Sequence, residues 1–406
     1  MNSPRVHLLC LALVACSDDA ADGSAEGTGS DSLASDSIHV PTDGDGGEDK
    51  LDLGMGDDDG CGQQSGDLGL SFIWIANSTE GTISKIDTVL MRERGRYIVR
   101  PDSAGNPSRT SVNLDGDVAV ANRNGGITKI WALADRCDES NDIPGIQTAT
   151  GPEFLDWGEE ECIAWHTPMD YKSQRPVAWT HGTFNKDTCR HEQQKLWTAG
   201  SNTPGIVDII RLDGDTGEVD AQITITDVYA DNYGVYGAAV DAKGNFWGSQ
   251  VGHGKLIFVD AQTLEYKLWD TPHGAYGISI DRNGYVWTCS GNAMRFDPKS
   301  ETFDSVPAGE YGGCMADGGT TLYKPTPGGI LALDTVTMAI KQTYTLPQHI
   351  HGISIDFNGY VWGVSQDTVA YRLDPADGTY ETIGGLVGAY TYSDMTGFAL
   401  SNTYVP

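Results

Sequence analysis

Histidine and tyrosine side chains at one position of a repeated segment are the residues that could carry out acid–base chemistry. Tyr236, Tyr276 and His351 each precede a Gly and a short run that ends in Asp. His351 is the one histidine among them. His349 lies two residues earlier, and with His273 the pair could also bind a metal or line a polar funnel.

The segment that would position these residues has the pattern of a four-stranded antiparallel sheet. Its clearest copies, at 236–247, 276–287 and 351–362, contain a β-rich run, an Asp-x-x-Gly turn and a second run ending in Trp, which is typical of a hairpin. A third run and a fourth run follow. Four strands in about forty residues match a propeller blade, and the Trp residues are expected to pack between blades.

Weaker copies keep the same register, and together the copies predict seven blades. The weaker copies lie near Trp74, Ser108, Leu196 and Gly312. The first copy begins with its second strand, while the chain ends with one spare strand at 392–400. We therefore expect an all-β, seven-bladed β-propeller over 68–406, closed when the C-terminal strand supplies the innermost strand of the first blade.

Strand ends around a propeller axis converge on one mouth, which is the default ligand position in this architecture. Amides, hydroxyls and aromatic rings there would suit a small molecule, a glycan, a peptide or a protein. They could equally satisfy strand-end hydrogen bonds around a water-filled channel. The predicted mouth residues are Asn77, Arg109, Asn122, Tyr236, Gln250, His273, Tyr276, Ser290, His351 and Ser365.

The copies that read Gly-Ile-Ser-Ile-Asp-x-Asn-Gly-Tyr-Val-Trp resemble the repeats of the streptogramin B lyase (virginiamycin B lyase) family of seven-bladed propellers, over 68–406. The resemblance implies a magnesium-assisted elimination that opens a cyclic ester or peptide. A base would remove the proton beside the ester carbonyl while the cation stabilises the enolate-like charge. His351 matches the family's His, and the resemblance therefore implies that it is the catalytic residue, but Ser365 stands where the family has Glu. A lyase is thus the alternative to a binding or interaction module without catalysis, and a purely structural role as a spacer or envelope subunit is a third interpretation.

One insertion, at about 134–173, interrupts the repeats. Within it, Asp138, Ser140 and Asp142 place oxygen side chains at alternate positions before a Gly, as a calcium loop does, although the Gly comes two residues late. A surface loop bounded by a disulfide is the alternative. Even numbers of Cys in exported chains indicate disulfides, and the predicted local pairs are Cys137 with Cys162 and Cys289 with Cys314.

The N-terminal residues carry an export signal. Residues 6–15 form an apolar run that is too short to span a bilayer, so 1–15 are expected to be a signal peptide. The run ends Leu-Val-Ala-Cys16, which resembles the lipobox of bacterial lipoproteins, although a plain signal peptide would also fit. Residues 16–67 are rich in acidic residues, Gly and Ser, which predicts a disordered tether. We expect an exported protein that is lipid-anchored through Cys16 to the outer membrane or cell surface.

The charge of the chain restricts its partners. The 406 residues have a formal net charge of -31, so nucleic acid is an unsuitable partner because the chain repels phosphate. No Cys-x-x-Cys motif occurs, which argues against a structural zinc site. We expect a monomer that contacts the membrane only through its anchor.

Overall fold

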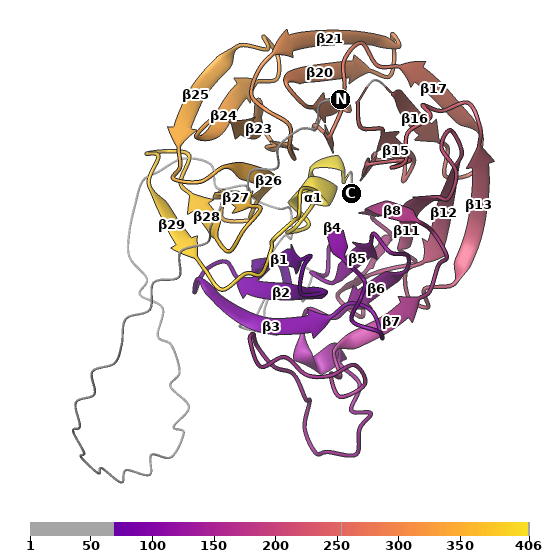
Figure 1. Cartoon of the computed structure of the whole chain (residues 1–406), viewed down its shortest axis with the longest axis vertical. Helices are drawn as coiled ribbons and strands as arrows, with labels where there is room; N and C mark the ends of the chain where they lie inside the picture. The colour runs from indigo at the N-terminus through magenta and orange to yellow at the C-terminus, as the bar shows by residue number, and fades with distance from the viewer. Residues whose placement is uncertain (1–68, 253, 405–406) are drawn as a thin grey trace, which may run out of the picture. The chain divides into compact units, whose positions relative to one another are not determined.

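The computed structural model describes residues 69–252 and 254–404, which form seven antiparallel sheets around a common axis (Figure 1). Within each blade, strands that follow one another pair, except that β8 pairs with β11 across an intervening hairpin, and the strands of each blade follow one another from the axis outward (Figure 1). The sequence-based prediction of a seven-bladed, all-β propeller is confirmed. A short 3-10 helix, η1 (Gly69–Ser71), precedes the first blade.

The bounds of the strands agree with four strands per blade in six of the seven blades. Blades 1 to 3 contain β1 (Phe72–Asn77), β2 (Thr82–Asp87), β3 (Arg92–Ile98); β4 (Pro107–Val112), β5 (Val118–Asn122), β6 (Ile127–Ile130), β7 (Ile163–Thr167); and β8 (Ser173–Trp179), β11 (Lys195–Ser201), β12 (Val207–Asp213), β13 (Val219–Ile225). Blades 4 and 5 contain β14 (Gly237–Val240), β15 (Phe246–Ser249), β16 (Lys255–Val259), β17 (Tyr266–Asp270); and β18 (Gly277–Ile280), β19 (Val286–Cys289), β20 (Asn292–Asp297), β21 (Thr302–Pro307). Blades 6 and 7 contain β22 (Met315–Ala316), β23 (Thr321–Thr326), β24 (Gly329–Asp334), β25 (Ile340–Thr345); and β26 (Ile350–Ile355), β27 (Val361–Ser365), β28 (Ala370–Leu373), β29 (Tyr380–Ile383).

The Asp-x-x-Gly…Trp motif explains why the inner hairpin repeats so regularly. In blade 5, Oδ1 of Asp281 accepts hydrogen bonds from the turn, and Oδ2 accepts the indole N–H of Trp287 at 2.9 Å. Gly284 at φ +81° completes the turn in a conformation that favours glycine. Because the indole N–H is satisfied locally, the fully buried Trp287 ring can pack against apolar residues of blade 6, such as Leu322, as predicted.

The C-terminal segment closes the ring beside β1. The backbone N–H of Trp74 donates to the carbonyl of Met395 at 2.9 Å, and Ala389 forms an antiparallel bridge with Asn77. The predicted position of the closing segment is therefore confirmed, but its predicted form as one strand over 392–400 is wrong: 392–397 contain no strand, and a helix occupies the rest of that range. The helix α1 (Phe398–Thr403) begins there, because Asp394 accepts hydrogen bonds from the backbone of the first helical turn.

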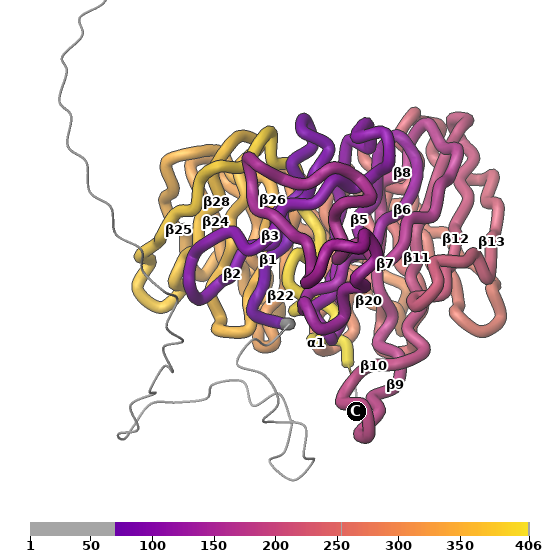
Figure 2. The backbone as a smooth tube through the Cα atoms, turned by 90° about the horizontal axis from the view of Figure 1, so that it is seen from below, coloured from indigo at the N-terminus to yellow at the C-terminus, as the bar shows by residue number. Residues whose placement is uncertain are grey.

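The interruption of blade 2 is shorter than predicted. After β6 the chain forms a 3-10 helix, η2 (Ala134–Arg136), and a loop that the Cys137–Cys162 disulfide closes. The remaining part of the predicted insertion contains β7, the outer strand of blade 2. A hairpin of β9 (Thr183–Asn185) and β10 (Arg190–Glu192), which the sequence analysis did not predict, follows β8 and lies with α1 at one end of the ring (Figure 2).

The predicted signal peptide at 1–15, the lipidation site Cys16 and the tether at 16–67 lie outside the described residues. Both predicted disulfides are confirmed, since Cys289 and Cys314 are joined as well, linking β19 to the start of blade 6. Among the described residues, no helix is long and apolar enough to cross a membrane.

Candidate functional site

Aromatic side chains from different blades meet on the propeller axis where the inner strands begin. Tyr236 precedes β14, Tyr276 precedes β18 and His351 lies in β26. Tyr390 and Tyr392 come from the C-terminal segment. The rings of neighbouring members lie 4.7 to 5.6 Å apart, so the five side chains form one continuous group.

Hydrogen bonds between side-chain ends hold this group together. The Tyr236 hydroxyl lies 3.1 Å from that of Tyr276 and 3.0 Å from that of Tyr390. The Tyr276 hydroxyl also bonds to the Tyr390 hydroxyl and, at 2.9 Å, to Nε2 of His351. Burial, with a further contribution from the nearby Arg109 guanidinium, lowers the pKa of His351 to about 3. His351 is therefore neutral near pH 7, and it is nearly enclosed by phenol groups.

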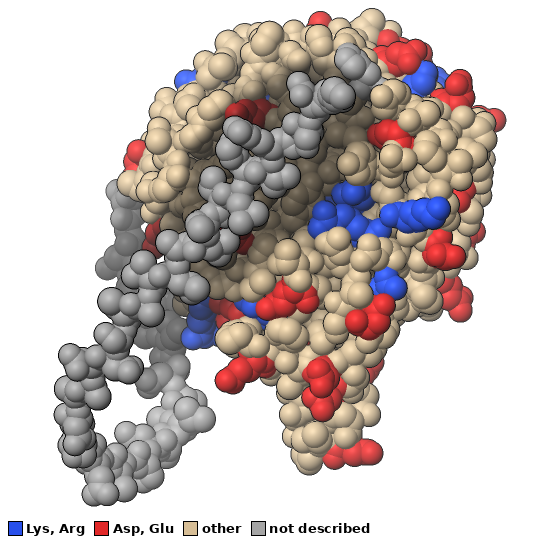
Figure 3. All heavy atoms as spheres, in the orientation of Figure 1, with Lys and Arg blue, Asp and Glu red and all other residues tan. Residues whose placement is uncertain are grey.

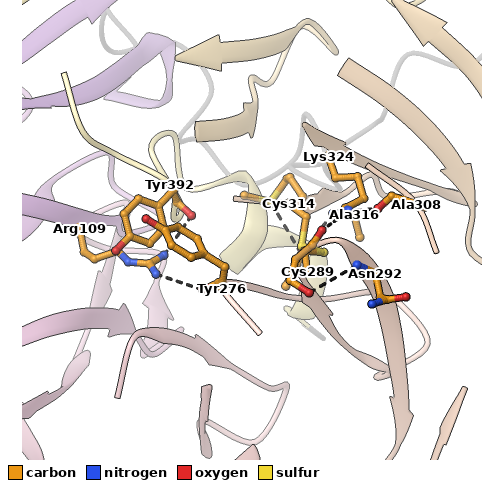
Figure 4. The surroundings of a disulfide bond; sticks show 12 residues. Arg109, Tyr276, Cys289, Asn292, Ala308, Cys314, Ala316, Lys324 and Tyr392 are labelled. Carbon is orange, nitrogen blue, oxygen red and sulfur yellow. Dashed lines mark hydrogen bonds between the residues drawn. A yellow bond between two sulfur atoms is a disulfide. The ribbon is translucent and has the colours of Figure 1, made fainter. Parts of the chain in front are cut away.

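Arg109 of β4 lies beneath these rings and is fully buried. Its Nη atoms donate to the backbone carbonyls of Tyr392 at 3.0 Å and Tyr276 at 3.3 Å (Figure 4). Its guanidinium carbon is 3.1 Å from the centroid of the Tyr392 ring. Nε of Arg109 has no hydrogen-bond partner, and no carboxylate of the described residues forms an ion pair with this guanidinium.

Two further arginines stand at the edge of the same group and are partly exposed. The guanidinium carbon of Arg123 is 4.7 Å from the Tyr390 ring centroid, and that of Arg175 is 4.8 Å from the Tyr236 ring and 4.9 Å from the Tyr233 ring. Burial and repulsion by Arg175 lower the pKa of Arg123. We call this set the tyrosine–arginine cluster: Arg109, Arg123, Arg175, Tyr233, Tyr236, Tyr276, His351, Tyr390 and Tyr392. Lys and Arg side chains gather beside the central hollow over β4 and β8 (Figure 3).

Four of the predicted mouth residues, Arg109, Tyr236, Tyr276 and His351, meet in this cluster. Most of the others form hydrogen bonds at strand ends, within a blade or to the adjoining one, which was the alternative interpretation. Nδ2 of Asn77 donates to Ser84 Oγ at 2.8 Å, and Oε1 of Gln250 accepts from the backbone of Tyr229 at 2.9 Å.

The remaining mouth residues have similar structural roles. Nδ2 of Asn122 donates to the Val99 carbonyl, and Oγ of Ser365 donates to the Val369 carbonyl. The Ser290 carbonyl accepts a hydrogen bond from the buried Lys324 at 2.7 Å, beside the Cys289–Cys314 disulfide (Figure 4). His273 is partly exposed in the loop before β18.

The structure does not assemble the predicted metal sites within its described part. His349 lies just before β26, is half-exposed and is 3.4 Å from Glu310, and its ring centroid is 6.4 Å from that of His351. His351 contacts phenols and lies near a guanidinium, which do not fit magnesium because that ion prefers carboxylate oxygens. No three His, Cys, Asp or Glu residues of the described chain are grouped to hold a metal ion.

The calcium candidate in the insertion is organised around a carboxylate instead. The side chains of Asp138, Ser140 and Asp142 are exposed. Glu161 accepts hydrogen bonds from the backbone of Ser140 at 2.6 Å and of Gln147 at 2.8 Å. The backbone N–H groups of the loop therefore donate to a carboxylate of the protein itself. Among the described residues, no group of His, Cys, Asp or Glu side chains supports the predicted calcium site.

The opposite end of the ring contains a larger cleft. A volume of about 300 Å³ lies between blades 3 and 4, lined by His181, Lys195, Arg211, Lys243 and Tyr404 among others. Burial lowers the pKa of His181 to about 4, and its Nε2 lies 3.1 Å from the Leu400 carbonyl. The axial channel itself encloses only about 30 Å³, which is room for about one water molecule.

Lys195 and Arg211 in this cleft are already paired. Nζ of Lys195 lies 2.8 Å from Asp213 and 3.0 Å from Asp220, and Nε of Arg211 lies 2.8 Å from Asp220. Two of the three Lys and Arg residues that line the cleft are therefore balanced by carboxylates, unlike the arginines of the tyrosine–arginine cluster, while Lys243 has no ion pair among the described residues.

Sequence reasoning missed Arg123, Arg175, Tyr233, Tyr390 and Tyr392 as site residues. The glycine that follows Tyr236, Tyr276 and His351 was a usable signal of close packing at the axis. A Cβ at Gly277 would lie 2.7 Å from the carbonyl of Gly312 in the next blade, and one at Gly352 would overlap the carbonyl of Thr391. These glycines let the inner strands and the C-terminal segment approach closely at the axis.

Comparisons with known proteins agree on the fold. No family model matches the chain, and no curated protein matches it. Solved structures that are similar to it include RRP9 WD40 repeats, with 8% identity, 73% of this chain and 84% of that chain covered, and a TM-score of 0.55. A functionally unknown protein from Desulfotomaculum acetoxidans DSM 771 has 10% identity, coverage of 80% and 98%, and a TM-score of 0.53. Virginiamycin B lyase from Staphylococcus aureus has 15% identity, coverage of 74% and 93%, and a TM-score of 0.49. At these identities, the likeness establishes a propeller fold and no activity.

Proposed function

We propose that the protein is a binding module that takes its ligand at the tyrosine–arginine cluster. The observation that carries this proposal is the convergence of Arg109, Arg123 and Arg175 without an ion-paired carboxylate among the described residues. Cations that lie close together cost free energy unless they are paired, above all where one of them, here Arg109, is fully buried. Such arrangements cluster at functional sites, where a ligand can supply the missing partner.

The elimination chemistry of a magnesium-dependent lyase is a less suitable function for this cluster. A general base works best when its pKa is near the working pH, whereas that of His351 is about 3. The side chain of His351 is also 5% exposed, beneath Tyr390 and beside Tyr276. Ligand binding at the cluster requires neither a base with a pKa near the working pH nor an exposed imidazole, so we favour binding over catalysis.

We also propose that the binding module is exported and anchored by lipid at Cys16. The apolar run before Cys16 and the acidic residues after it support this proposal, and the two disulfides are consistent with an oxidising compartment. Metabolic labelling with a fatty-acid analogue should tag the whole chain in the membrane fraction, and the Cys16→Ala variant should lose the tag. Equal labelling of both chains would refute the anchor.

A thermal-shift screen of the whole chain against sugars, cyclic peptides and divalent metals tests the binding function. A ligand of the cluster should raise the melting temperature of the unmodified chain, since binding to the folded state stabilises it. The rise should be much smaller in Arg175→Gln. The matched control is Lys267→Gln, which removes an exposed cation of β17 far from the axis. If every stabilising ligand acted equally on Arg175→Gln and Arg123→Gln, the cluster would not be the binding site.

A further inference from the structure

We propose that the ligand of the tyrosine–arginine cluster is a sugar that carries a carboxylate, such as a uronic acid unit. This inference rests on the proposed function and adds the chemical class of the ligand. Two properties of the cluster lead to it: the unused hydrogen-bond donors of its arginines and the exposed aromatic rings around them.

The two rim arginines have guanidinium donors that the described residues do not use. Nε of Arg175 donates to Ser173 Oγ at 3.3 Å, and its two Nη atoms have no acceptor in the described part of the chain. Arg123 uses Nε and Nη2 on Asn106, and its Nη1 is similarly unengaged there. A carboxylate is the acceptor that matches a planar guanidinium, since its two oxygens can take two parallel N–H bonds.

The positions of these arginines direct them to one small group. Arg175 lies over the Tyr236 ring and Arg123 over the Tyr390 ring, and the hydroxyls of those two tyrosines are only 3.0 Å apart. Rings below the guanidiniums restrict their orientation and so reduce the ordering cost of binding. A single carboxylate near both arginines would also relieve the repulsion between them.

The nearest acidic side chains do not take that role. Oδ1 of Asp231 accepts from the backbone of Tyr233 at 2.9 Å and of Gly234 at 2.8 Å, and Asp231 forms no ion pair with Arg175. Glu310 is beside His349 instead. Arg109, buried below with an unpartnered Nε, adds a third positive charge that the described residues leave uncompensated. The cluster is thus a cationic site in a strongly acidic chain, which favours a small anion over a large acidic polymer.

The aromatic rings favour a sugar acid over a bare anion. Tyr233 is 47% exposed and Tyr311 is 52% exposed. Tyr233 contacts Tyr236, and the Tyr311 ring lies 6.2 Å from that of Tyr276, so both flank the cluster. These rings offer flat apolar faces for the C–H face of a pyranose, and the phenol hydroxyls can exchange hydrogen bonds with sugar hydroxyls. Inorganic phosphate would use the arginines alone.

Isothermal titration calorimetry of the whole chain tests the proposal with four probes: trigalacturonic acid, its fully methyl-esterified form, a short glutamate-containing peptide and inorganic phosphate. We expect the acid to bind and esterification to weaken binding by about tenfold or more, because each charged hydrogen bond is worth about 1.5–3 kcal/mol. Arg175→Gln and Arg123→Gln should each weaken binding of the acid by a similar factor, and Arg175→Lys, which keeps the charge without the fork, should give an intermediate loss. Lys267→Gln should bind as the unmodified chain does, and the melting temperature of each variant without ligand shows whether it is folded.

The outcomes separate this inference from the proposed function. Equal binding of the acid and its ester, tighter binding of phosphate or of the peptide, or no binding of the acid at millimolar concentration would each overturn the sugar-acid assignment. If the probe that does bind is weakened by Arg175→Gln, the cluster remains a binding site for another ligand. Binding of the acid that is unchanged in both Arg175→Gln and Arg123→Gln would overturn the assignment and the proposed site together.

Discussion

Cationic side chains near the two ends of the propeller axis have different neighbours. At the end that contains α1, cationic side chains meet carboxylates: Arg136 lies 2.6 Å from Asp117, and Lys195 lies 2.8 Å from Asp213. At the end where the inner strands begin, Arg109, Arg123 and Arg175 have aromatic rings and carbonyls as neighbours instead. Carboxylates are abundant in this chain, so it is informative that none of the described residues forms an ion pair with these three arginines.

Cavity size and unpaired charge favour different ends of the molecule. The cleft beside Tyr404 is the larger space, but its principal cations are paired and Tyr404 packs against the protein's own His181. Cations that are paired within the protein stabilise the fold and leave little charge for a ligand. Unpaired cations destabilise the fold and leave their charge available to a ligand. Comparing the two ends therefore separates charge that supports the fold from charge that is available for binding.

The largest expected effect concerns a paired carboxylate at the α1 end. Asp117 is fully buried, and it accepts from Arg136 at 2.6 Å and from the backbone of Ala132 at 3.0 Å. Asp117→Ala should lower the free energy of unfolding by about 4 kcal/mol, because it leaves buried cations without their partner. Guanidinium chloride denaturation of the whole chain at pH 7 measures the loss.

The matched change at the other end is Arg109→Met, which keeps a long apolar side chain against the Tyr392 ring. It removes an unpaired buried charge and also two hydrogen bonds to carbonyls, and these effects oppose each other. We expect the free energy of unfolding to change by about 1 kcal/mol or less. A loss as large as that of Asp117→Ala would mean that Arg109 supports the fold, and the contrast between the ends would fail.

Acid should destabilise the protein through both ends. His351 and His181 have folded pKa values of about 3 and about 4, below the 6.5 expected when unfolded. Their contribution to stability is complete above pH 6.5 and is lost as the pH falls toward those folded values. Between pH 6.5 and pH 4, the free energy of unfolding should fall by about 2 kcal/mol less in His351→Gln than in the unmodified chain. Denaturation of both chains at each pH measures this difference.

Asp394 titrates in the opposite direction at the α1 end. Burial raises its pKa to about 6, so its contribution to stability is complete below its unfolded pKa of 3.8 and is lost as the pH rises through 6. Asp394→Asn should therefore make the loss of stability in acid steeper than in the unmodified chain. A pH profile that is unchanged by both His351→Gln and Asp394→Asn would contradict the buried state of these groups.

Short-range chemistry explains what could be predicted from the sequence. The Asp281 carboxylate bonds to an indole six residues away, so the motif is visible in every strong copy and the blades can be counted. The disulfide pairs are also local within the sequence, 25 residues apart in both cases. The fold and the covalent links could therefore be predicted without knowledge of any contact between distant segments.

The site could be predicted only in part because it depends on contacts between distant segments. Arg175 lies in β8, at the edge of the segment that was interpreted as an insertion, and its partner Tyr236 belongs to the next blade. The run Phe-Ala-Leu at 398–400 alternates as a strand would, and only the hydrogen bonds of Asp394 and the contacts of α1 with β18 and β26 decide for a helix. The expectation that strand ends converge on the mouth also selected side chains such as Asn77, whose hydrogen bonds stay within its own blade and the adjoining C-terminal segment.

The smallest expected effect comes from a substitution that would make the cleft at the α1 end resemble the other end. Asp220 is partly exposed and pairs with both Lys195 and Arg211, so Asp220→Asn should cost less than about 1 kcal/mol of stability. The variant should gain weak stabilisation by sulfate, because its cleft then holds cations that are no longer fully paired. Asp304→Asn is the matched control, since it makes the same charge change beside Arg295 on the outer strand β21. Equal stabilisation of the two variants by sulfate would show that net charge, rather than local pairing, controls anion binding, and the distinction between the two ends would lose its physical basis.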